Sequence, residues 1–489
     1  MVYLIISKIK EIYFFMHDKL KHLIKTSKDL FSLDYIDRLS KNSGFSKRKG
    51  KLSAKDFLAF NIFSSEDMCT KSLSTLSARL DAQFGILMSP QSLNERFNDN
   101  SVKFMQEIFR TMLTKQNKVL STKLAVLPKV FNRILVTDST IITLPREFYS
   151  EFRESGNEYL GAAAKIQLQY DLLTGTFTCC EIQEGITSDA SYTDTMSNYI
   201  APTDLSLADL GYYKSDFLKE INGKEAFYIS KIKNNTAIYI KNPNPEIYKT
   251  TGNIKKSTEF IKIDIYKYIE ELEEYQTIEL NDIFIGEKKE LKPRLIITKL
   301  SKEHTKQRSN RHKESVNKHR GSLNPRSVSW NSLNAYITNV EDTILKTKEI
   351  HLFYSLRWQV ELMFKIWKSL FKINRVKKVK IQRFKCFLYG RLISLLLSSS
   401  IVFTAKTIIL EEENKEISNF KSFDKVIEYF PMLRQEIFYG EIAITRIFKR
   451  LILVIGKLGI KSKKKGSNST KDILNLISSQ AIPNVKSII

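Results

Sequence analysis

The stretch HLFYSLRWQVELMFKIWKSL, residues 351 to 370, gives the strongest indication of how this chain folds. It carries four polar side chains at successive spacings of three, four and seven residues: Tyr354, Arg357, Glu361 and Lys368. At about 3.6 residues per turn, the four fall on one face of a single helix, and Lys365 lies close to that face. An adjacent apolar face would pack and hold the carboxylate rigidly among the cations. A solvated row of ion pairs is the other interpretation of this pattern.

The charge of the chain indicates a polyanionic partner. The 489 residues include 78 Lys plus Arg against 53 Asp plus Glu, for a net charge of +25. An excess of this size favours nucleic acid, although a basic protein with a merely solvated surface has the same composition. The length suits about two to four domains, each with a sizeable core.

Cysteine and hydropathy patterns exclude several classes of protein. There are four Cys and no CxxC pair, so neither a zinc ribbon nor a disulfide framework is expected, and a reducing cytoplasm fits. Lys8, Lys10 and Glu11 interrupt the apolar N-terminus and make it a poor signal peptide. The apolar run from Leu392 to Ala405 is shorter than the ~20 residues of a membrane helix. We expect a buried helix there and no membrane span.

Residues 1 to 128 have a helical apolar period. Ser53 and Ser89 are expected to be N-caps, and Pro90 occupies the first helical position after Ser89. A short basic loop joins two of the expected helices and contains Lys47, Arg48 and Lys49. Such a unit suits DNA binding; the alternative is a helical cap with no ligand.

From about residue 130 the apolar period is that of strands. Arg133 to Thr137 is a short strand that runs into Asp138. AKIQLQYDLLTGTFTCCEIQ contains two strands joined in a hairpin near Thr174 and Gly175. A strand, turn and helix follow around Asp209, and a further strand comes after them. The basic stretch from Lys299 to Arg320 has no apolar stripe; it is either an exposed helix or a segment that becomes ordered on nucleic acid.

Two acidic residues stand at the ends of expected strands. Asp138 ends ILVTD and Asp209 ends LSLAD. A carboxylate at the end of a buried strand is costly unless it has a partner or a function. With the helical Glu361 the two could form a two-metal phosphoryl-transfer site, because hard oxygen ligands suit Mg²⁺. Either Asp alone is more typical of a turn or a helix cap.

These stretches resemble the insertion-sequence-4 family of bacterial DDE transposases. The Tyr-x2-Arg-x3-Glu-x6-Lys signature of that family matches Tyr354, Arg357, Glu361 and Lys368 without a gap. Its first Asp block matches Asp138 in TDST, and its second matches Asp209, Gly211 and Tyr212. The resemblance covers roughly residues 130 to 400. Trp330 lies a little upstream of the place where relatives often carry a Trp able to stack on an unpaired base. We expect a core Trp, with base stacking as the alternative.

The resemblance implies an α/β fold: a ribonuclease-H-like catalytic core with a β-rich insertion, plus helical N- and C-terminal regions. It implies that Asp138, Asp209 and Glu361 are catalytic and bind Mg²⁺ or Mn²⁺. Tyr354, Arg357 and Lys368 would hold DNA phosphates; Lys365 is added from helix geometry alone, and a solvated lysine is the alternative for it. The expected regions are a helical DNA-binding region (1–128), the first part of the core (129–235), the insertion (236–340), the second part of the core (341–405) and a helical C-terminal region (406–489).

The resemblance therefore implies a transposase of a bacterial insertion sequence, which cuts double-stranded DNA at transposon ends and joins it to target DNA. A homodimer would pair two ends, and the N-terminal helices would recognise the terminal repeat. The expected location is the bacterial cytoplasm, in association with the nucleoid. The alternatives are a nuclease or domesticated relative that does not transpose, and a DNA-binding protein without chemistry. The acidic triad argues against the last, because carboxylates facing phosphate weaken binding unless metal intervenes.

Overall fold

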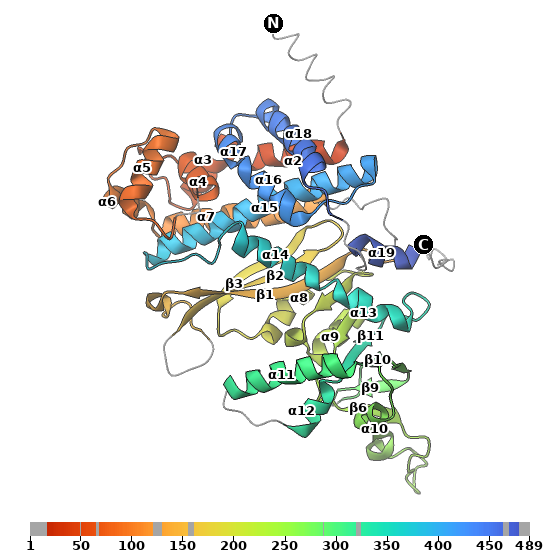
Figure 1. Cartoon of the computed structure of the whole chain (residues 1–489). Helices are drawn as coiled ribbons and strands as arrows, with labels where there is room; N and C mark the ends of the chain where they lie inside the picture. The colour runs from red at the N-terminus through yellow and green to blue at the C-terminus, as the bar shows by residue number, and fades with distance from the viewer. Residues whose placement is uncertain are drawn as a thin grey trace. The chain divides into compact units, whose positions relative to one another are not determined.

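In the computed structural model the chain divides into two units that share one strand and one helix (Figure 1). The helical unit comprises Met1–Val126, Ser139–Thr187 and Val360–Ser467, and the sheet unit comprises Leu127–Asp138, Ser188–Gln359 and Asn468–Ile489. The structure describes residues 17–48, 50–64, 68–120, 130–154, 161–286, 288–318, 324–462 and 469–478.

The first part of the helical unit confirms the helical period of the N-terminal region. Its helices are α2 (Asp18–Leu30), α3 (Leu33–Asn42), α4 (Ala54–Phe63), α5 (Leu73–Phe84), α6 (Pro90–Arg96) and α7 (Asp99–Leu120). Ser53 accepts a hydrogen bond from Asp56 N, and Ser89 accepts one from Ser92 N with Pro90 next to it. Both serines are therefore N-caps, as expected from the sequence.

A long apolar helix forms the core of the helical unit. The C-terminal helices of this unit are α14 (Trp358–Ser369, from Val360 onward), α15 (Ile381–Glu413), α16 (Asn419–Glu428), α17 (Phe430–Glu436) and α18 (Glu441–Leu458). Among the described residues, α15 is the helix with the length and hydropathy of a membrane span, but 89% of its apolar window is buried inside the protein. It packs against α2, α4, α7, α16 and α18. The run from Leu392 to Ala405 is thus a buried core segment, as expected.

Backbone contact between α15 and α4 fixes the centre of this unit. A Cβ atom at Gly390 would lie 2.5 Å from the carbonyl oxygen of Asn61, so the close approach requires glycine. One turn later, Ser394 Oγ donates a hydrogen bond of 2.7 Å to the carbonyl oxygen of Ile62. A small residue and a hydroxyl thus let the two helices pack backbone against backbone.

The expected hairpin is present in the helical unit. β2 (Ala162–Asp171) pairs antiparallel with β3 (Phe177–Glu184), and the turn contains Thr174 and Gly175. α7 contacts β3. The hairpin prediction from alternating runs around Thr-Gly is confirmed.

A mixed sheet forms the sheet unit. Its strands, in spatial order, are β1 (Ile134–Leu144), β4 (Leu205–Ala208), β5 (Phe227–Lys231), β11 (Leu333–Thr338), β10 (Arg294–Lys299) and β8 (Thr277–Leu280). β1, β4 and β5 are mutually parallel, and the later pairs are antiparallel. β1 continues past Asp138 into the helical unit, where its neighbour is β2. The chain is therefore a mixed α/β protein with a large mixed sheet.

The remaining elements of the sheet unit are helices beside the main sheet and a smaller second sheet. The helices are α8 (Thr193–Ser197), α9 (Ser215–Gly223), α10 (Ile265–Glu270), α11 (Lys302–Lys318), α12 (Pro325–Trp330), α13 (Thr347–Ser355) and α19 (Thr470–Ser478). α9 and α13 contact β5. The second sheet has the order β7 (Phe260–Lys262), β6 (Ile238–Lys241), β9 (Ile283–Ile285).

Three expectations from the sequence need correction here. The strand expected at Arg133 to Thr137 does not end at Asp138, because the observed strand β1 continues to Leu144. Among the described residues of the expected insertion at 236–340, β8, β10 and β11 extend the main sheet, and β6, β7 and β9 form a separate sheet. Trp330 is not a core residue, since α12 has no buried residue; its ring lies 6.1 Å from that of Tyr266. The basic stretch is a helix, α11, over Lys302–Lys318.

Candidate active site

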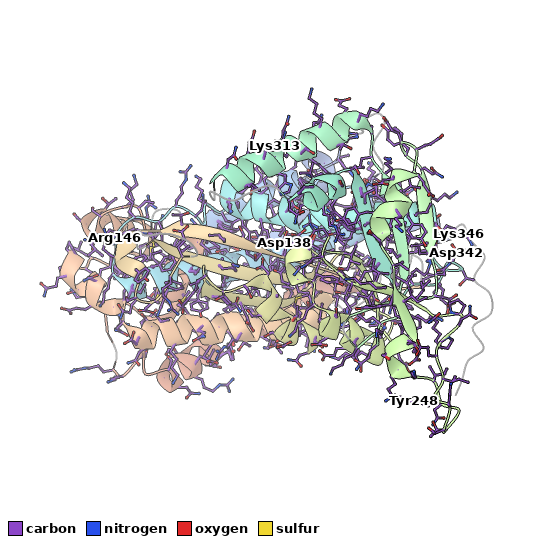
Figure 2. All side chains as sticks on the ribbon, turned by 90° about the horizontal axis from the view of Figure 1, so that it is seen from below. Asp138, Arg146, Tyr248, Lys313, Asp342 and Lys346 are labelled. Atoms are coloured by element: carbon purple, nitrogen blue, oxygen red, sulfur yellow. The ribbon has the colours of Figure 1, made fainter. Side chains whose placement is uncertain are left out.

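Strand register places Asp138 and Asp209 side by side. The parallel ladder between β1 and β4 ends at the pair Thr137 and Ala208, and each Asp is the next residue along its strand. Parallel neighbours lie about 4.8 Å apart and end at the same edge of the sheet. The two carboxylates thus lie side by side where the β1–β4 ladder ends, although β1 itself continues to Leu144; Asp138 is labelled in Figure 2.

Asp209 is not a side-chain helix cap. It precedes the short 3-10 turn Leu210–Tyr212, and its side chain makes no capping hydrogen bond. Only its backbone carbonyl closes the turn, by accepting from Tyr212 N at 3.0 Å. Asp209 therefore occupies a turn, one of the two alternatives for it, but its carboxylate does not cap the turn and is available for other contacts.

The turn that follows Asp209 is tightly packed against Asp189. A Cβ atom at Gly211 would lie 3.1 Å from Asp189 Oδ2, closer than an ordinary contact. A larger residue at position 211 would push on this carboxylate or on the turn itself. The glycine two residues after Asp209 thus has a packing reason.

Arg357 joins the two carboxylates. Its Nη1 donates to Asp138 Oδ2 at 2.9 Å, and its Nε lies 3.9 Å from Asp209 Oδ1. The Arg357 side chain is 13% exposed and that of Asp138 is 19% exposed, whereas Asp209 is 46% exposed. Two adjacent carboxylates repel one another, and a partly buried guanidinium between them offsets that repulsion.

The stretch that carries Arg357 is not one helix. α13 ends at Ser355 and α14 begins at Trp358. Backbone bonds at the junction have the tighter three-residue spacing, with Leu356 N bonded to Phe353 O, Arg357 N to Tyr354 O and Gln359 N to Leu356 O. The expected single face of one helix is therefore wrong, and Arg357 stands in the connecting turn.

Tyr354 supports the strand that carries Asp209. Its hydroxyl donates to the carbonyl oxygen of Ala208 at 3.2 Å, and its ring lies 5.0 Å from that of Tyr336. The residue is buried, and burial raises the pKa of its phenol. A buried hydroxyl that bonds to Ala208 holds the peptide next to Asp209 in place.

The other residues of the signature belong to the helical unit. Glu361 lies in the first turn of α14, four residues after Arg357, and is half-buried. Lys365 is exposed, and burial lowers the pKa of the half-buried Lys368. The structure thus brings together Asp138, Asp209 and Arg357, while the roles of Glu361, Lys365 and Lys368 stay predictions.

Two carboxylates that both contact the same positively charged group are suited to a divalent cation, because such ions prefer oxygen ligands. Asp138 and Asp209 meet this condition, because both approach the Arg357 guanidinium. Among the described residues there is no group of three or more His, Cys, Asp or Glu arranged to hold a metal. The carboxylate pair offers oxygen donors of the kind that divalent cations prefer, and its role as a metal site stays a prediction.

The basic loop lies in the helical unit, after α3. Lys47 and Arg48 are both exposed, and Lys49 lies outside the described residues. Exposure leaves the first two accessible to a phosphate backbone. Their role in DNA binding stays a prediction.

Two lysines at the end of β5 were not singled out in the sequence. Lys231 Nζ lies 5.5 Å from the centre of the Tyr354 ring, and Lys233 Nζ lies 5.7 Å from that of Tyr213. β5 is parallel to β4, so its carboxyl end lies at the edge that carries Asp209. The sequence signal was a Lys-x-Lys at the end of an apolar strand, which reveals its neighbours only once strand order is known.

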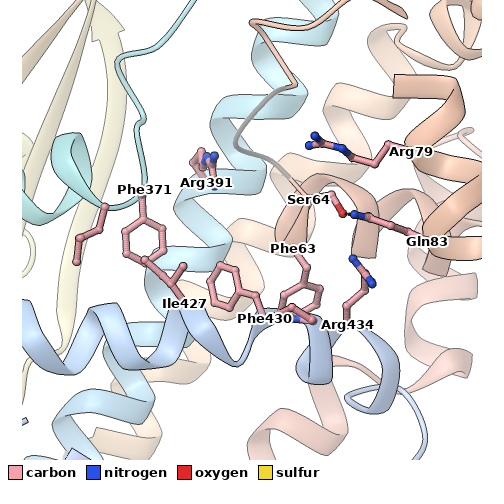
Figure 3. Close-up of a pocket in the computed structure, with 11 residues that line it drawn as sticks. Phe63, Ser64, Arg79, Gln83, Phe371, Arg391, Ile427, Phe430 and Arg434 are labelled. Atoms are coloured by element: carbon pink, nitrogen blue, oxygen red, sulfur yellow. Dashed lines mark hydrogen bonds between the residues drawn. The ribbon is translucent and has the colours of Figure 1, made fainter. Parts of the chain in front are cut away.

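A pocket in the helical unit contains none of the expected site residues (Figure 3). Its volume is about 270 Å³, and its lining combines aromatic residues with three arginines, Arg79, Arg391 and Arg434. Figure 3 shows Phe371 and Phe430 on the other side of the pocket from Arg79 and Gln83. No catalytic role follows from it.

Known proteins resemble this chain along most of its length. Residues 130–397 match the Transposase DDE domain family. The chain is 50% identical over 462 residues to a transposase for insertion sequence element IS1151 of Clostridium perfringens, covering 94% of this chain and 98% of that protein. It is 33% identical over 447 residues to a transposase for insertion sequence element IS231B of Bacillus thuringiensis subsp. berliner, covering 91% and 92%. A cryo-EM structure of a piggyBac transposase synaptic complex with hairpin DNA aligns at 11% identity and a TM-score of 0.45, covering 95% of this chain and 86% of that one.

Proposed function

Because this chain belongs to the DDE transposase family and is a transposase of an insertion sequence, we propose that Asp138, Asp209 and Glu361 are its catalytic carboxylates. The enzyme cleaves DNA and transfers strands, and its family implies dependence on a divalent metal. We place it in the insertion-sequence-4 family on the spacing of Tyr354, Arg357, Glu361 and Lys368. The observation that carries the site is the convergence of Asp138 and Asp209 on Arg357.

The proposed ion is Mg²⁺, with Mn²⁺ as a substitute, held by Asp138, Asp209 and Glu361. Bound there, it would activate water or a 3′ hydroxyl and stabilise the leaving oxygen. The two Asp side chains present their oxygens from neighbouring strands. Tyr354 keeps the second of these strands in place through Ala208.

Arg357 has two proposed partners. Without DNA it holds the two carboxylates, at 2.9 Å and 3.9 Å. With a cation on the carboxylates, its planar fork would bind a DNA phosphate, for which bidentate geometry is well suited. Lys365 and Lys368 are proposed to add point charges along the same DNA strand, on the helix that carries Glu361.

The rest of the assignment extends the family to the whole chain. We propose a ribonuclease-H-like core, supported by the β3-β2-β1 run in one unit and the parallel β1-β4-β5 run in the other. Lys47, Arg48 and Lys49 would contact the terminal repeat, and two copies of the chain would pair two transposon ends. The enzyme would act on nucleoid DNA in the bacterial cytoplasm.

The test is cleavage of a labelled duplex that carries the terminal repeat of the element, with Mg²⁺ or Mn²⁺. Glu361→Gln should abolish cutting at the repeat boundary while DNA binding persists, because the change removes a metal ligand but keeps the shape. Glu412→Gln is the matched control, as Glu412 is exposed in the same unit. Cutting that survives Glu361→Gln would remove Glu361 from the site.

A second readout separates a transposase from a nuclease of the same fold. The cut end is mixed with an unlabelled second duplex, and covalent joining is followed on a denaturing gel. Wild type should join the end to the second duplex, and Glu361→Gln should not. Cutting without joining by folded wild type would identify a nuclease or a non-transposing relative.

A further inference from the structure

A lysine stripe on α11 has no role in the site described above. α11 contains six Lys or Arg and two Glu. At about 100° per residue, Lys302, Lys306 and Lys313 fall within about 40° of one another on the helix. All three are exposed, and none has an ion-pair partner among the described residues. Figure 2 shows Lys313 on α11. We call these three residues the lysine stripe.

The helix that carries the stripe is anchored through another face, about 120° around the helix axis from the stripe. Arg308 Nη1 donates to the carbonyl oxygen of Leu333 and its Nη2 to Asn334 Oδ1, both at 2.7 Å. His312 Nδ1 lies 3.0 Å from Asn331 Nδ2. Ser301 caps the first turn by accepting from His304 N. α11 is therefore held on the start of β11, and the three lysines of the stripe take no part in that contact.

The sheet topology places this anchor at the catalytic edge. β11 runs antiparallel to β5, with Tyr336 opposite Lys231, so the start of β11 lies at the carboxyl end of β5. β5 is parallel to β4 and β4 to β1, so this is also the edge of Asp209 and Asp138. Three strand spacings of about 4.8 Å separate β1 from β11, or about 14 Å. Lys231 lies between, at the end of β5.

The size and charge of the stripe fit a DNA backbone. Eleven residues separate Lys302 from Lys313, which is about 16 Å of helix at 1.5 Å per residue. One strand of a duplex carries a phosphate every ~3.4 Å along the axis, so this length spans roughly five phosphates. Glu303 and Glu314 lie about 60–120° around the helix from the three lysines and so stand beside the stripe rather than in it. On the proposed function, the transposon end would lie at the catalytic edge during both cutting and joining, so it is the DNA that this surface would meet in both steps.

Resting on the proposed function, we propose that Lys302, Lys306 and Lys313 bind backbone phosphates of the transposon-end duplex held at Asp138 and Asp209. The contacts read no sequence; they fix the direction in which the duplex leaves the carboxylate pair. The lysine stripe is thus a DNA-backbone binding surface of the sheet unit, separate from the Tyr354 to Lys368 signature.

The test is binding of a labelled terminal-repeat duplex in EDTA, by fluorescence anisotropy over a series of salt concentrations. Lys302→Gln/Lys306→Gln/Lys313→Gln should raise Kd on the order of tenfold to a hundredfold. It should also make the negative slope of log K against log salt less steep by about 2 to 3, because each phosphate contact contributes about 0.9 to the steepness. The Lys→Arg version of the triple variant keeps the charge and should bind like wild type.

The matched control is Lys241→Gln/Lys249→Gln/Lys262→Gln, which removes three exposed charges from the same unit. An unchanged salt slope in the stripe variant, or an equal fall in the control, would overturn the proposal. So would normal binding of the end combined with loss of joining to a second duplex, which would assign the stripe to target DNA. Wild type that neither binds nor cuts the repeat would overturn the proposed function itself. If wild type binds and cuts the repeat but the stripe variant shows no change in binding, only the proposal about the stripe fails.

Discussion

The guanidinium of Arg357 lies between the carboxylates of Asp138 and Asp209, with Nη1 2.9 Å from Asp138 Oδ2 and Nε 3.9 Å from Asp209 Oδ1. This single cation comes from the turn between α13 and α14, and the carboxylates come from two parallel strands. The arrangement compensates two like charges in the absence of metal. On the proposed function, Arg357 would change partner when a divalent ion binds the two carboxylates.

Removing one carboxylate should abolish metal-dependent chemistry without loss of DNA binding. Asp138→Asn and Asp209→Asn should each lower the cleavage rate by at least about a hundredfold, since even indirect partners of metal ligands cost ten- to hundredfold. DNA affinity in EDTA should stay the same or rise, because a negative charge facing phosphate has gone. Asp216→Asn, an exposed site on α9, should change neither quantity. Near-normal cleavage by either active-site variant would contradict the assignment.

Arg357→Gln should make the protein more dependent on metal for its stability. The change removes the guanidinium that contacts both Asp138 and Asp209, at a cost of about 1–3 kcal/mol. A divalent ion would offset much of this cost. Thermal unfolding is therefore compared with and without Mg²⁺, and the rise in Tm on adding Mg²⁺ should be larger for Arg357→Gln than for wild type. An equal rise in both proteins would show that Arg357 and the ion do not share the carboxylates.

Tyr354→Phe distinguishes a positioning role from a phosphate contact. The variant keeps the ring beside Tyr336 and loses the hydrogen bond to Ala208, which is worth about 0.5–1.5 kcal/mol. We expect slower cleavage with unchanged DNA affinity. A hydroxyl that bound phosphate would instead weaken DNA binding, and cleavage would recover at saturating DNA. Rates at several DNA concentrations separate the two outcomes.

Local features of the fold were predictable from the sequence because they depend on neighbours in the chain. The caps Ser53 and Ser89, the hairpin at Thr174 and the apolar strands before Asp138 and Asp209 all follow from short-range patterns. The resemblance to a transposase family added the expected order of the catalytic residues; membership of the DDE transposase family is confirmed, while the insertion-sequence-4 assignment and the catalytic residues stay predictions.

Long-range features were not predictable in this way. Nothing in the sequence of β11 indicates that it pairs with β5, so the extension of the main sheet by β11, β10 and β8 was missed. Periodicity also predicted one helix across residues 351 to 370, because the apolar spacing is continuous through a turn whose hydrogen bonds tighten only around Arg357. The place of Lys231 near the carboxylates and the position of α11 at the catalytic edge also depend on strand order, so they too could not be predicted from the sequence.

Acid should weaken the sheet unit through the pair Glu279 and Arg294 on β8 and β10. Arg294 Nε and Nη2 donate to the two carboxylate oxygens at 2.8 Å and 2.9 Å, and these hydrogen bonds lower the pKa of Glu279 from 4.5 to about 2. Because the folded pKa is lowered, the stabilising contribution is fully present above about pH 4.5 and is lost as the pH falls through about 2. Glu279→Gln should unfold more easily at neutral pH and lose less stability on acidification than wild type.

Urea unfolding at a series of pH values measures this difference. Glu274→Gln, an exposed carboxylate of the same unit, serves as the control and should follow the wild-type curve. Parallel curves for Glu279→Gln and wild type would mean that the pair does not contribute to acid sensitivity.

Gly390→Ala should destabilise the helical unit although alanine is the better helix former. The new methyl group would lie 2.5 Å from the carbonyl oxygen of Asn61, and a backbone atom cannot move aside as a flexible side chain can. Separating α15 from α4 should cost about 1–3 kcal/mol and lengthen the hydrogen bond from Ser394 to Ile62. Gly223→Ala is the matched control, since no atom lies within 4 Å of its added methyl group at the end of α9. That variant should be neutral or stabilised by up to ~1 kcal/mol. The thermal unfolding temperature of Gly390→Ala should therefore fall, while that of Gly223→Ala should stay the same or rise. Equal stability of Gly390→Ala and wild type would contradict the close contact of the two helices.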